Sequence, residues 1–306
     1  MVDVLKQNYP DSIIDILVNK RVIDLIDDYP NINKVHSIEK DSFKAIKDVC
    51  KNNGYDIAII VYPRFIIALA VFMSGIKKRL GTGYRWYSFL FNLKRHQHRK
   101  YAEKHELEFN LDMLTELDCK IPDKIKLNIN VSGNTTESLK SKIYNFDWNG
   151  NFIIIHPGSM GSAKRWRKEN FIELIKLIQT DTNLYINIVL TGSQDEEVLL
   201  YSIEKKVNSN NLFTITNLNL KELATLIKQS QMFVSNSTGP IHIAAAVGTF
   251  VVGLYPAKLQ ESAARWGPYT DKKKIFSSGL KDEESEFLED INPLEVYEFI
   301  KSYLSK

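Results

Sequence analysis

Alternating strand-like and helix-like segments constrain the fold of this chain more than any other feature of its sequence. In the second half, short runs of β-branched and aromatic residues recur at regular intervals, and most of them are separated by helix-like runs. Strands that alternate with helices are typical of parallel sheets covered by helices. The predicted strands of this half are FIII (152–155), YINIVL (185–190), LFTI (212–215), QMFV (231–234), FVVGL (250–254) and KKIF (273–276), and NPLEVYEFIKSYL (292–304) is the predicted closing helix.

The first half follows the same alternation. FKAIKDVCKNNG (43–54) predicts a helix that ends on Gly54, because glycine readily takes the left-handed conformation of a C-cap. FIIALAVFMSGI (65–76) is too short to span a bilayer and predicts a buried helix. The predicted strands are SIIDILV (12–18), KVHSI (34–38), DIAIIV (56–61) and KIKLNI (124–129).

A polar segment divides the chain into two predicted domains. YNFDWNGN, from residue 144, has the composition of a linker, and 306 residues suffice for two domains. We predict two Rossmann-like α/β domains, 1–146 and 147–306, with the last helix packing back on the first domain. Because ligands of such sheets bind beyond the carboxyl ends of the strands, a cleft between the domains is the expected active site.

Charge and cysteine usage restrict the partners and the compartment. The net charge of +3 is too small by itself to indicate nucleic acid, and we expect no such partner. Cys50 and Cys119 lie far apart and lack metal-ligand spacing, which is typical of reduced thiols in a cytoplasmic protein.

The loop HPGSMGSAKRW (156–166) follows the first predicted strand of the second half. Its small residues, including Ser159, let backbone N–H groups approach an anion, and Lys164 adds an ammonium group. The loop lacks the Gly-Lys-Ser/Thr order of a Walker A motif. It predicts a phosphate site, and the alternative is an ordinary connection with a surface lysine.

Two further segments follow predicted strands of the same half. In IVLTGSQDEEV (188–198), a carboxylate of Asp195 or Glu196 could accept hydrogen bonds from ribose hydroxyls; the alternative is favourable acid placement in a first helical turn. In MFVSNSTGPIHIAAAVGT (232–249), a helix is predicted to begin at Gly239-Pro240, and its free N–H groups would meet a pyrophosphate. The candidate residues of this segment are Ser237, Thr238, Gly239 and His242, and a purely structural histidine is the alternative for His242.

The three segments, in this order, resemble glycosyltransferase family 9, the ADP-heptose:lipopolysaccharide heptosyltransferases. The matching motifs read SMGSAKRW, TGSQDE and STGPIHIAAA, and ARWGPY (264–269) resembles the family's late Arg-Trp-x-Pro element. YPDSIIDILV, YPNINKVHSI, KKRLGTG and HELEFNLDML lie at family-like spacing in the first half. The resemblance implies a GT-B fold and an inverting, metal-independent transfer of a sugar, heptose in the family, from an ADP-linked donor. It implies no cofactor and no metal site.

The resemblance also implies roles for individual residues. The second domain would bind the donor, and Lys164 would stabilise the leaving nucleoside diphosphate together with the helix that begins at Gly239. Many members have Asp at the position of Ser237; the hydroxyl can still cap the helix, but a negative charge near the donor is lost. The implied donor contacts are Ser159 and Lys164 for the diphosphate, Glu196 or Asp195 for the ribose, Leu218 for the base, and Thr238, Gly239 and His242 again for the diphosphate.

The beginning of the sequence departs from the family pattern. MVDVLKQNYPDSIIDILV matches the family's first helix and second strand, so the first strand and its Gly-Asp loop are missing. The Asp of that loop is the proposed general base, and Asp3 lies within the helix rather than in such a loop. We expect that this sequence starts at an internal Met, and that its first domain lacks one strand.

The predicted acceptor side lies in the first domain. RLGTGYRWYSFLFNLKRHQHRK (79–100) mixes cations, imidazoles and aromatic rings, with Arg85, His96 and His98 as candidate residues. This mixture suits an anionic glycolipid or other cell-surface glycan acceptor, such as a lipopolysaccharide precursor, met by peripheral contact at the cytoplasmic face of the inner membrane. A basic loop without a ligand is the alternative.

Two other functions stay open at this point. A nucleotide-sugar-binding protein without turnover follows from the missing Asp loop. A GT-B sugar-nucleotide epimerase would need carboxylates and histidines from both domains around the donor sugar, and the sequence contains no clear set of this kind.

Overall fold

Two units make up this computed structural model, Met1–Ile125 and Lys126–Lys306. It describes residues 1–131, 134–143, 146–148, 150–159, 161, 163–279 and 285–305. The boundary falls before α5 (Asn134–Lys142), earlier than the predicted division after residue 146. The reason is a buried carboxylate: Glu222 of α8 (Leu220–Gln229) accepts hydrogen bonds from Ser138 and Lys142 of α5, both at 2.7 Å. The segment before the predicted linker therefore belongs to the second unit.

The second unit is built on one parallel sheet with the strand order β11-β10-β9-β6-β7-β8. Counted from β6 as the first strand and read from β8, this is the order 3-2-1-4-5-6 of a doubly wound Rossmann fold. All six predicted strands are present. Their bounds are β6 Phe152–His156, β7 Asn187–Thr191, β8 Leu212–Ile215, β9 Met232–Asn236, β10 Phe250–Pro256 and β11 Lys273–Ser278.

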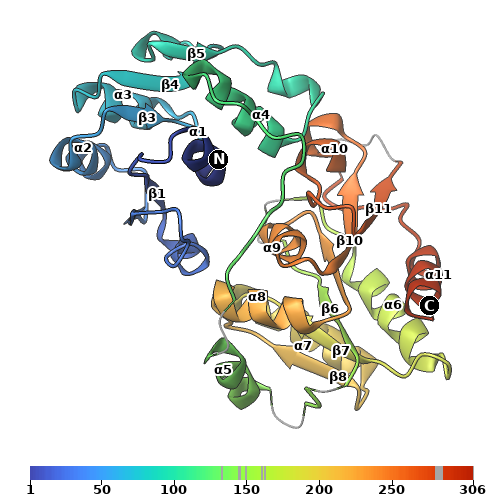
Figure 1. The fold of residues 1–306 in the computed structure, drawn as a ribbon. Helices are drawn as coiled ribbons and strands as arrows, with labels where there is room; N and C mark the ends of the chain where they lie inside the picture. The colour runs from blue at the N-terminus through green and yellow to red at the C-terminus, as the bar shows by residue number, and fades with distance from the viewer. Residues whose placement is uncertain are drawn as a thin grey trace. The chain divides into compact units, whose positions relative to one another are not determined.

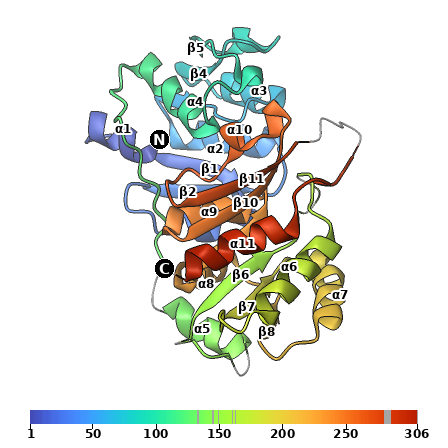
Figure 2. The ribbon, with the colours of Figure 1, turned by 90° about the vertical axis from the view of Figure 1, so that its right-hand side faces the viewer.

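Helices cover both faces of this sheet (Figure 1). On one face α6 packs between α7 and α11, and on the other α8 packs between α5 and α9. Figure 2 shows α6 and α11 in front of β6. The remaining bounds are α6 Lys168–Thr180, η5 Gln194–Glu196, α7 Glu197–Val207, α9 Gly239–Val247, η6 Leu259–Glu261, α10 Ala263–Trp266 and α11 Pro293–Leu304.

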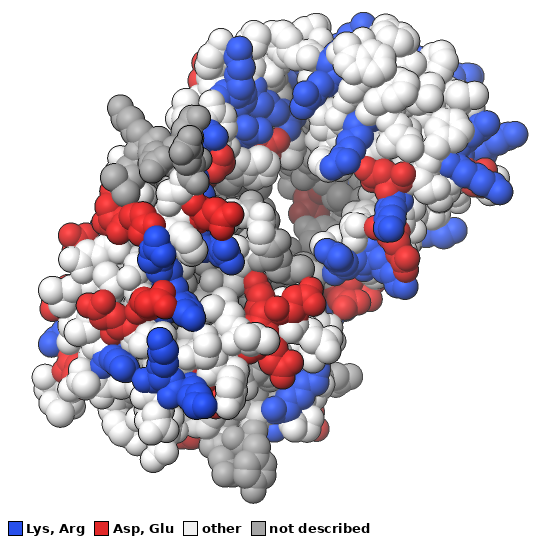
Figure 3. Space-filling view, turned by 180° about the vertical axis from the view of Figure 1, so that it is seen from behind, with Lys and Arg blue, Asp and Glu red and all other residues white. Residues whose placement is uncertain are grey.

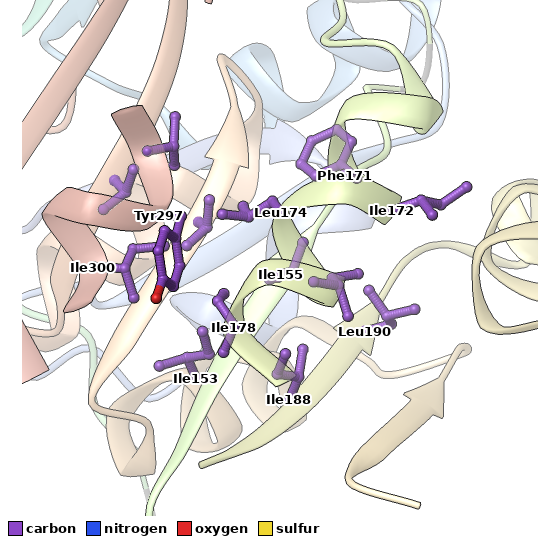
Figure 4. Packing of buried hydrophobic residues seen from close by; sticks show 14 of the residues in the cluster. Ile153, Ile155, Phe171, Ile172, Leu174, Ile178, Ile188, Leu190, Tyr297 and Ile300 are labelled. Carbon is purple, nitrogen blue, oxygen red and sulfur yellow. The ribbon is translucent and has the colours of Figure 1, made fainter. Parts of the chain in front are cut away.

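The last helix belongs to the core of the second unit. Asn292 caps α11 by accepting a hydrogen bond from Leu294 N–H at 2.9 Å, and Pro293 occupies the first turn. Tyr297 and Ile300 of α11 pack with α6 and with the isoleucines of β6 in one buried cluster (Figure 4). The structure therefore packs this helix on α6, in the core of the second unit.

The sheet of the first unit is interrupted. β1 (Asp15–Asn19) pairs in parallel with β2 (Lys34–Ile38), and β3 (Ile57–Ile59), β4 (Lys78–Thr82) and β5 (Leu93–Arg95) form a separate parallel sheet. Removing β6 from the second unit would leave the same arrangement of two strands plus three. Within the described residues, the first unit thus has no strand at the position that β6 occupies in the second.

The strands of the first unit are also less buried than those of the second. Every residue of β6 is buried, whereas no residue of β1 is fully buried. The two sheets share a hydrophobic cluster to which β1 contributes Leu17 and β2 contributes Ile38. The helical elements of this unit are α1 Val2–Asn8, η1 Lys20–Leu25, α2 Phe43–Asn53, α3 Phe65–Met73, η2 Ser88–Leu90, η3 Arg99–Tyr101, α4 Glu106–Asp112 and η4 Met113–Leu117.

Three expectations for this part of the chain need correction. Residues 124–129 form no strand: their alternate apolar side chains are half-buried, but no other strand lies beside them among the described residues. The basic segment 79–100 contains β4 and β5, which sequence inspection missed because both strands are short and carry cations. Finally, α3 is a helix as predicted, with Gly54 capping α2 before it, but α3 is only partly buried.

Candidate functional site

The candidate site lies at the carboxyl ends of β6 and β9. These strands are neighbours, and the order of the sheet reverses between them. In doubly wound folds, ligands bind outside the carboxyl ends of strands at this switch point. The loop after β6 carries Ser159 and Lys164, and the loop after β9 leads through Ser237 and Thr238 into α9. The fold thus brings together two of the three predicted donor segments.

Asn236 connects these two loops. Its side chain is fully buried at the end of β9. The side-chain Nδ2 donates to the carbonyl oxygen of Pro157 at 2.8 Å, and Oδ1 accepts a hydrogen bond from the backbone N–H of Trp166 at 2.9 Å. Both ends of the loop that contains Ser159 and Lys164 are therefore fixed by one amide group.

The indole of Trp166 provides a second anchor for this loop. Trp166 is buried, its ring packs edge-on against Phe171 of α6, and its Nε1 donates to the carbonyl oxygen of Ile291 at 2.8 Å. Ser159 is buried and Lys164 is half-buried. The lysine therefore projects from a loop whose ends are held in the core.

His156, the last residue of β6, is a buried and neutral imidazole. Its Nδ1 lies 2.9 Å from the hydroxyl of Thr191 at the end of β7. Burial lowers the pKa of His156 from 6.5 to about 4, although the Glu196 carboxylate acts in the opposite direction. The imidazole is therefore uncharged at neutral pH, so Lys164 rather than His156 supplies the positive charge on this loop.

The structure separates the two ribose candidates. The carboxylate of Glu196 lies so close to Gly158 that a Cβ at that position would overlap it. It accepts hydrogen bonds from the backbone N–H and the hydroxyl of Ser193, at 2.9 and 3.0 Å, which close a capping box. Asp195 is exposed on the neighbouring turn. Glu196 is thus the carboxylate positioned beside the β6 loop.

The N-terminus of α9 forms the opposite side of the site. Thr238 is its N-cap residue, and its buried hydroxyl lies 3.2 Å from that of Ser235 rather than on the helix backbone. A Cβ at Gly239 would meet nothing within 4 Å, so the space beside this residue is open. His242 lies on this turn and is half-buried. Free N–H groups and the helix dipole make this end suitable for an anion.

Two other predicted elements lie near this edge. The buried Tyr255 hydroxyl is hydrogen-bonded to Ser237 and donates to the carbonyl oxygen of Trp266 at 3.1 Å, which joins the late ARWGPY element to the α9 loop. Burial raises the pKa of Tyr255, so it stays a neutral phenol. Leu218 is half-buried in the loop between β8 and α8, also at the carboxyl edge of the sheet.

The acceptor candidates of the first unit also lie together. Arg85 follows β4, and His96 and His98 follow β5, so all three are at the carboxyl edge of that sheet. The Tyr84 ring contacts both imidazoles, with centroid distances of 5.4 Å to His96 and 4.2 Å to His98. A Cβ at Gly83 would overlap His96, so this glycine lets the imidazole lie against the β4 loop.

The described residues contain no group of three or more His, Cys, Asp or Glu side chains that could hold a metal ion. Nor is any helix in the described ranges long and apolar enough to cross a bilayer. What the carboxyl edge of the second unit offers is an ammonium group, a helix N-terminus and one positioned carboxylate. These groups suit a nucleotide with a diphosphate.

Sequence inspection did not assign roles to Asn236 and His156. Both are buried polar residues at the last position of a mainly apolar strand. That position is the available signal, because a polar side chain buried at the carboxyl end of a parallel strand needs a partner in the following loops.

Comparison with known proteins identifies the relatives of this chain. Residues 43–294 match the family model described as glycosyltransferase family 9 (heptosyltransferase). Lipopolysaccharide heptosyltransferase 3 of Escherichia coli is 23% identical over 288 residues, which are 90% of this chain and 83% of that protein. A glycosyl transferase family 9 structure from Veillonella parvula superposes with a TM-score of 0.84 at 17% identity, covering 99% of this chain and 91% of that one. The structure of E. coli ADP-heptose lps heptosyltransferase II gives 0.78 at 23% identity, with coverage of 99% and 92%.

Proposed function

Because this chain belongs to glycosyltransferase family 9 and is a glycosyltransferase with two Rossmann-like domains, we propose that it transfers a heptose from an ADP-linked donor to a lipopolysaccharide-type acceptor. The observation that supports the donor half is the meeting of the Lys164 loop, Glu196 and the start of α9 at one switch point. The donor sugar and nucleotide follow from the names of the relatives, which act on or are named for ADP-heptose and lipopolysaccharide.

The proposed donor site divides the nucleotide among the three segments. Ser159, Lys164 and the first turn of α9 would bind the diphosphate, with Thr238, Gly239 and His242 on that turn. Glu196 would accept hydrogen bonds from the ribose hydroxyls, and Leu218 would lie against the base. Two further residues would support the site: Ser193 holds the Glu196 carboxylate, and the neutral His156 links the end of β6 to Thr191 of β7.

The proposed reaction is a single displacement. An acceptor hydroxyl attacks the anomeric carbon as the bond to the diphosphate breaks, which inverts the configuration. The negative charge that develops on the leaving diphosphate would be stabilised by Lys164 and by the N–H groups of α9, without a metal ion. The acceptor would bind at the carboxyl edge of the first unit, near Arg85, His96 and His98. The enzyme would work in the cytoplasm, in peripheral contact with the inner membrane.

A second candidate is a nucleotide-sugar-binding protein without turnover. It is favoured by the divided sheet of the first unit, since among the described residues no strand joins β1 and β2 to β3, β4 and β5. The two candidates differ in one measurement: release of ADP and formation of product when donor and acceptor are supplied together.

The donor site is tested by thermal shift with ADP, UDP, GDP and their sugars. We expect ADP and ADP-heptose to stabilise the protein, and Lys164→Ala to abolish the shift, because the lysine is the cation of the loop. Lys176→Ala, an exposed lysine on α6, is the matched control and should leave the shift intact. An unchanged shift in Lys164→Ala would remove this residue from the site. Activity in the presence of a chelator then tests metal independence, and the anomeric configuration of the product tests inversion.

A further inference from the structure

One continuous stretch of the first unit has no negative charge. Between Asp56 and Glu103 the sequence contains no Asp or Glu, although the chain has 37 such residues in total. The same stretch contains nine cationic residues: Arg64, Lys77, Lys78, Arg79, Arg85, Lys94, Arg95, Arg99 and Lys100. Such segregation gives the surface built from it a positive potential.

The helix within this stretch is apolar on every side but not fully buried. FIIALAVFM of α3 has no polar side chain, and such a helix is normally enclosed by protein or lipid. Phe65 is 39% exposed, Phe72 46% and Met73 52%, whereas Ala70 on the opposite side is fully buried. Phe65 and Phe72 are seven residues apart, so they lie on one face of the helix.

Aromatic residues from neighbouring elements extend this face. Trp86, in the loop after β4, is 72% exposed, and its ring lies 4.7 Å from that of Phe65. Tyr62 is 54% exposed, with the guanidinium group of Arg64 over its ring at 4.9 Å. We call these exposed side chains, together with the nine cations of the same stretch, the aromatic–basic face. The exposed side chains are Tyr62, Phe65, Phe72, Met73 and Trp86. Figure 3 shows white side chains together with Lys and Arg over the end of the first unit that holds α3, β4 and β5.

Several cations of this face are available to an outside anion. Arg64 is paired with Asp41 at 3.5 Å, and Arg95 and Arg99 are paired with Glu116 and Glu106. Lys77, Lys78 and Arg85, in contrast, are exposed and form no ion pair with any described residue.

Exposed aromatic residues also occur on the second unit, but their surroundings differ. Tyr185 is 88% exposed and Tyr201 is 61% exposed. Tyr201 lies on α7, whose sequence EVLLYSIEKKV carries both signs of charge, with Glu197 in the first turn and Lys205 and Lys206 in the last. Exposed aromatic rings therefore occur on both units. The aromatic–basic face differs because its rings lie in a stretch with cations and no acidic residue.

We propose that the aromatic–basic face docks on the surface of a bilayer that contains anionic lipids. Aromatic side chains partition into the interfacial region of a bilayer, and nearby lysines and arginines are attracted to anionic headgroups. A nucleic acid would be attracted by the charge but would leave the apolar flank of Phe72 and Met73 exposed to water. This inference deepens the proposed function, because it identifies the surface that would bring a lipid-linked acceptor to the first unit.

Co-sedimentation of the full chain with vesicles tests the proposal. We expect binding to phosphatidylcholine vesicles that contain phosphatidylglycerol, weaker binding to pure phosphatidylcholine, and a decline with rising salt. Trp86→Ser should lower the partition coefficient by roughly tenfold. The pair Lys77→Gln and Lys78→Gln should lower it by about fivefold for each cation removed. The matched controls on the second unit are Tyr185→Ser and the pair Lys205→Gln and Lys206→Gln, which should bind as the unchanged protein does.

ADP binding, measured on the same samples, keeps this inference separate from the proposed function. No binding to anionic vesicles, or equal binding by all variants, would overturn the docking proposal while leaving donor binding intact. Binding of RNA with higher affinity than vesicles, unaffected by Trp86→Ser, would overturn it in favour of a nucleic-acid surface. Vesicle binding without any nucleotide binding would instead refute the proposed function and leave the docking surface standing.

Discussion

His156 should make the stability of the second unit depend on pH in a defined range. In the folded protein its pKa is lowered to about 4, whereas the ordinary value is 6.5. Between these values the unfolded chain binds a proton that the folded chain does not, so stability falls as the pH falls. At about 1.4 kcal/mol per unit of pKa, the lowered pKa changes the free energy of unfolding by about 3 kcal/mol in total. This contribution is complete above pH 6.5 and is lost as the pH approaches 4.

The test uses hydrogen exchange of the full chain in urea, from pH 4 to pH 8. The backbone amides of β6 and β7 report the free energy of unfolding of the second unit at each pH. His156→Gln removes the titrating group, and the expected result is a smaller slope between pH 4 and pH 6.5, whatever the variant's absolute stability. His98→Gln, an exposed histidine of the first unit, controls for the loss of one imidazole. Equal slopes in the unchanged protein and in His156→Gln would refute the reasoning, as would a directly measured titration of His156 near its ordinary pKa.

Two further changes test the loop that carries Lys164. Asn236→Ala should lower the free energy of unfolding of the second unit by about 2–5 kcal/mol, because it leaves the buried N–H of Trp166 and the buried carbonyl of Pro157 without their partner; a loss under about 1 kcal/mol in urea denaturation would contradict this. Gly158→Ala should displace the Glu196 carboxylate and weaken ADP binding about tenfold in calorimetry, with little loss of stability, because the overlapping atoms are at the end of a flexible side chain. Unchanged ADP affinity would mean that the position of Glu196 does not matter for the donor.

The second unit was largely predictable from its sequence, and the reason is burial. Strands such as β6, which are buried at every residue, require continuous apolar runs, and these runs are visible without a structure. The start of α9 was equally visible, because Gly239-Pro240 after serine and threonine has the residue types of a helix start. The hydrogen bonds of Asn236 were not, because they join residues about 70 positions apart in the chain.

The first unit was harder to predict, because its strands are short and only partly buried. β4 and β5 read as part of a basic loop, since their cations obscure the pattern of a core strand. The exposed side of α3 was missed for the opposite reason: its sequence is apolar throughout and does not indicate which face is left uncovered. In both cases the decisive factor is which neighbours cover the element, and that depends on contacts distant in sequence.

The interrupted sheet of the first unit has a consequence for its folding cooperativity. No ladder of backbone hydrogen bonds connects β1 and β2 with β3, β4 and β5 within the described residues. The two parts are joined by side chains: Leu17 and Ile38 in the shared cluster, and the Tyr55 hydroxyl, which donates to Asp15 at 2.7 Å. Because side-chain packing holds these two parts together, and apolar packing weakens on cooling, we expect the β1–β2 pair to be a separate unit of local unfolding. We expect it to open at a lower free energy than the donor site does.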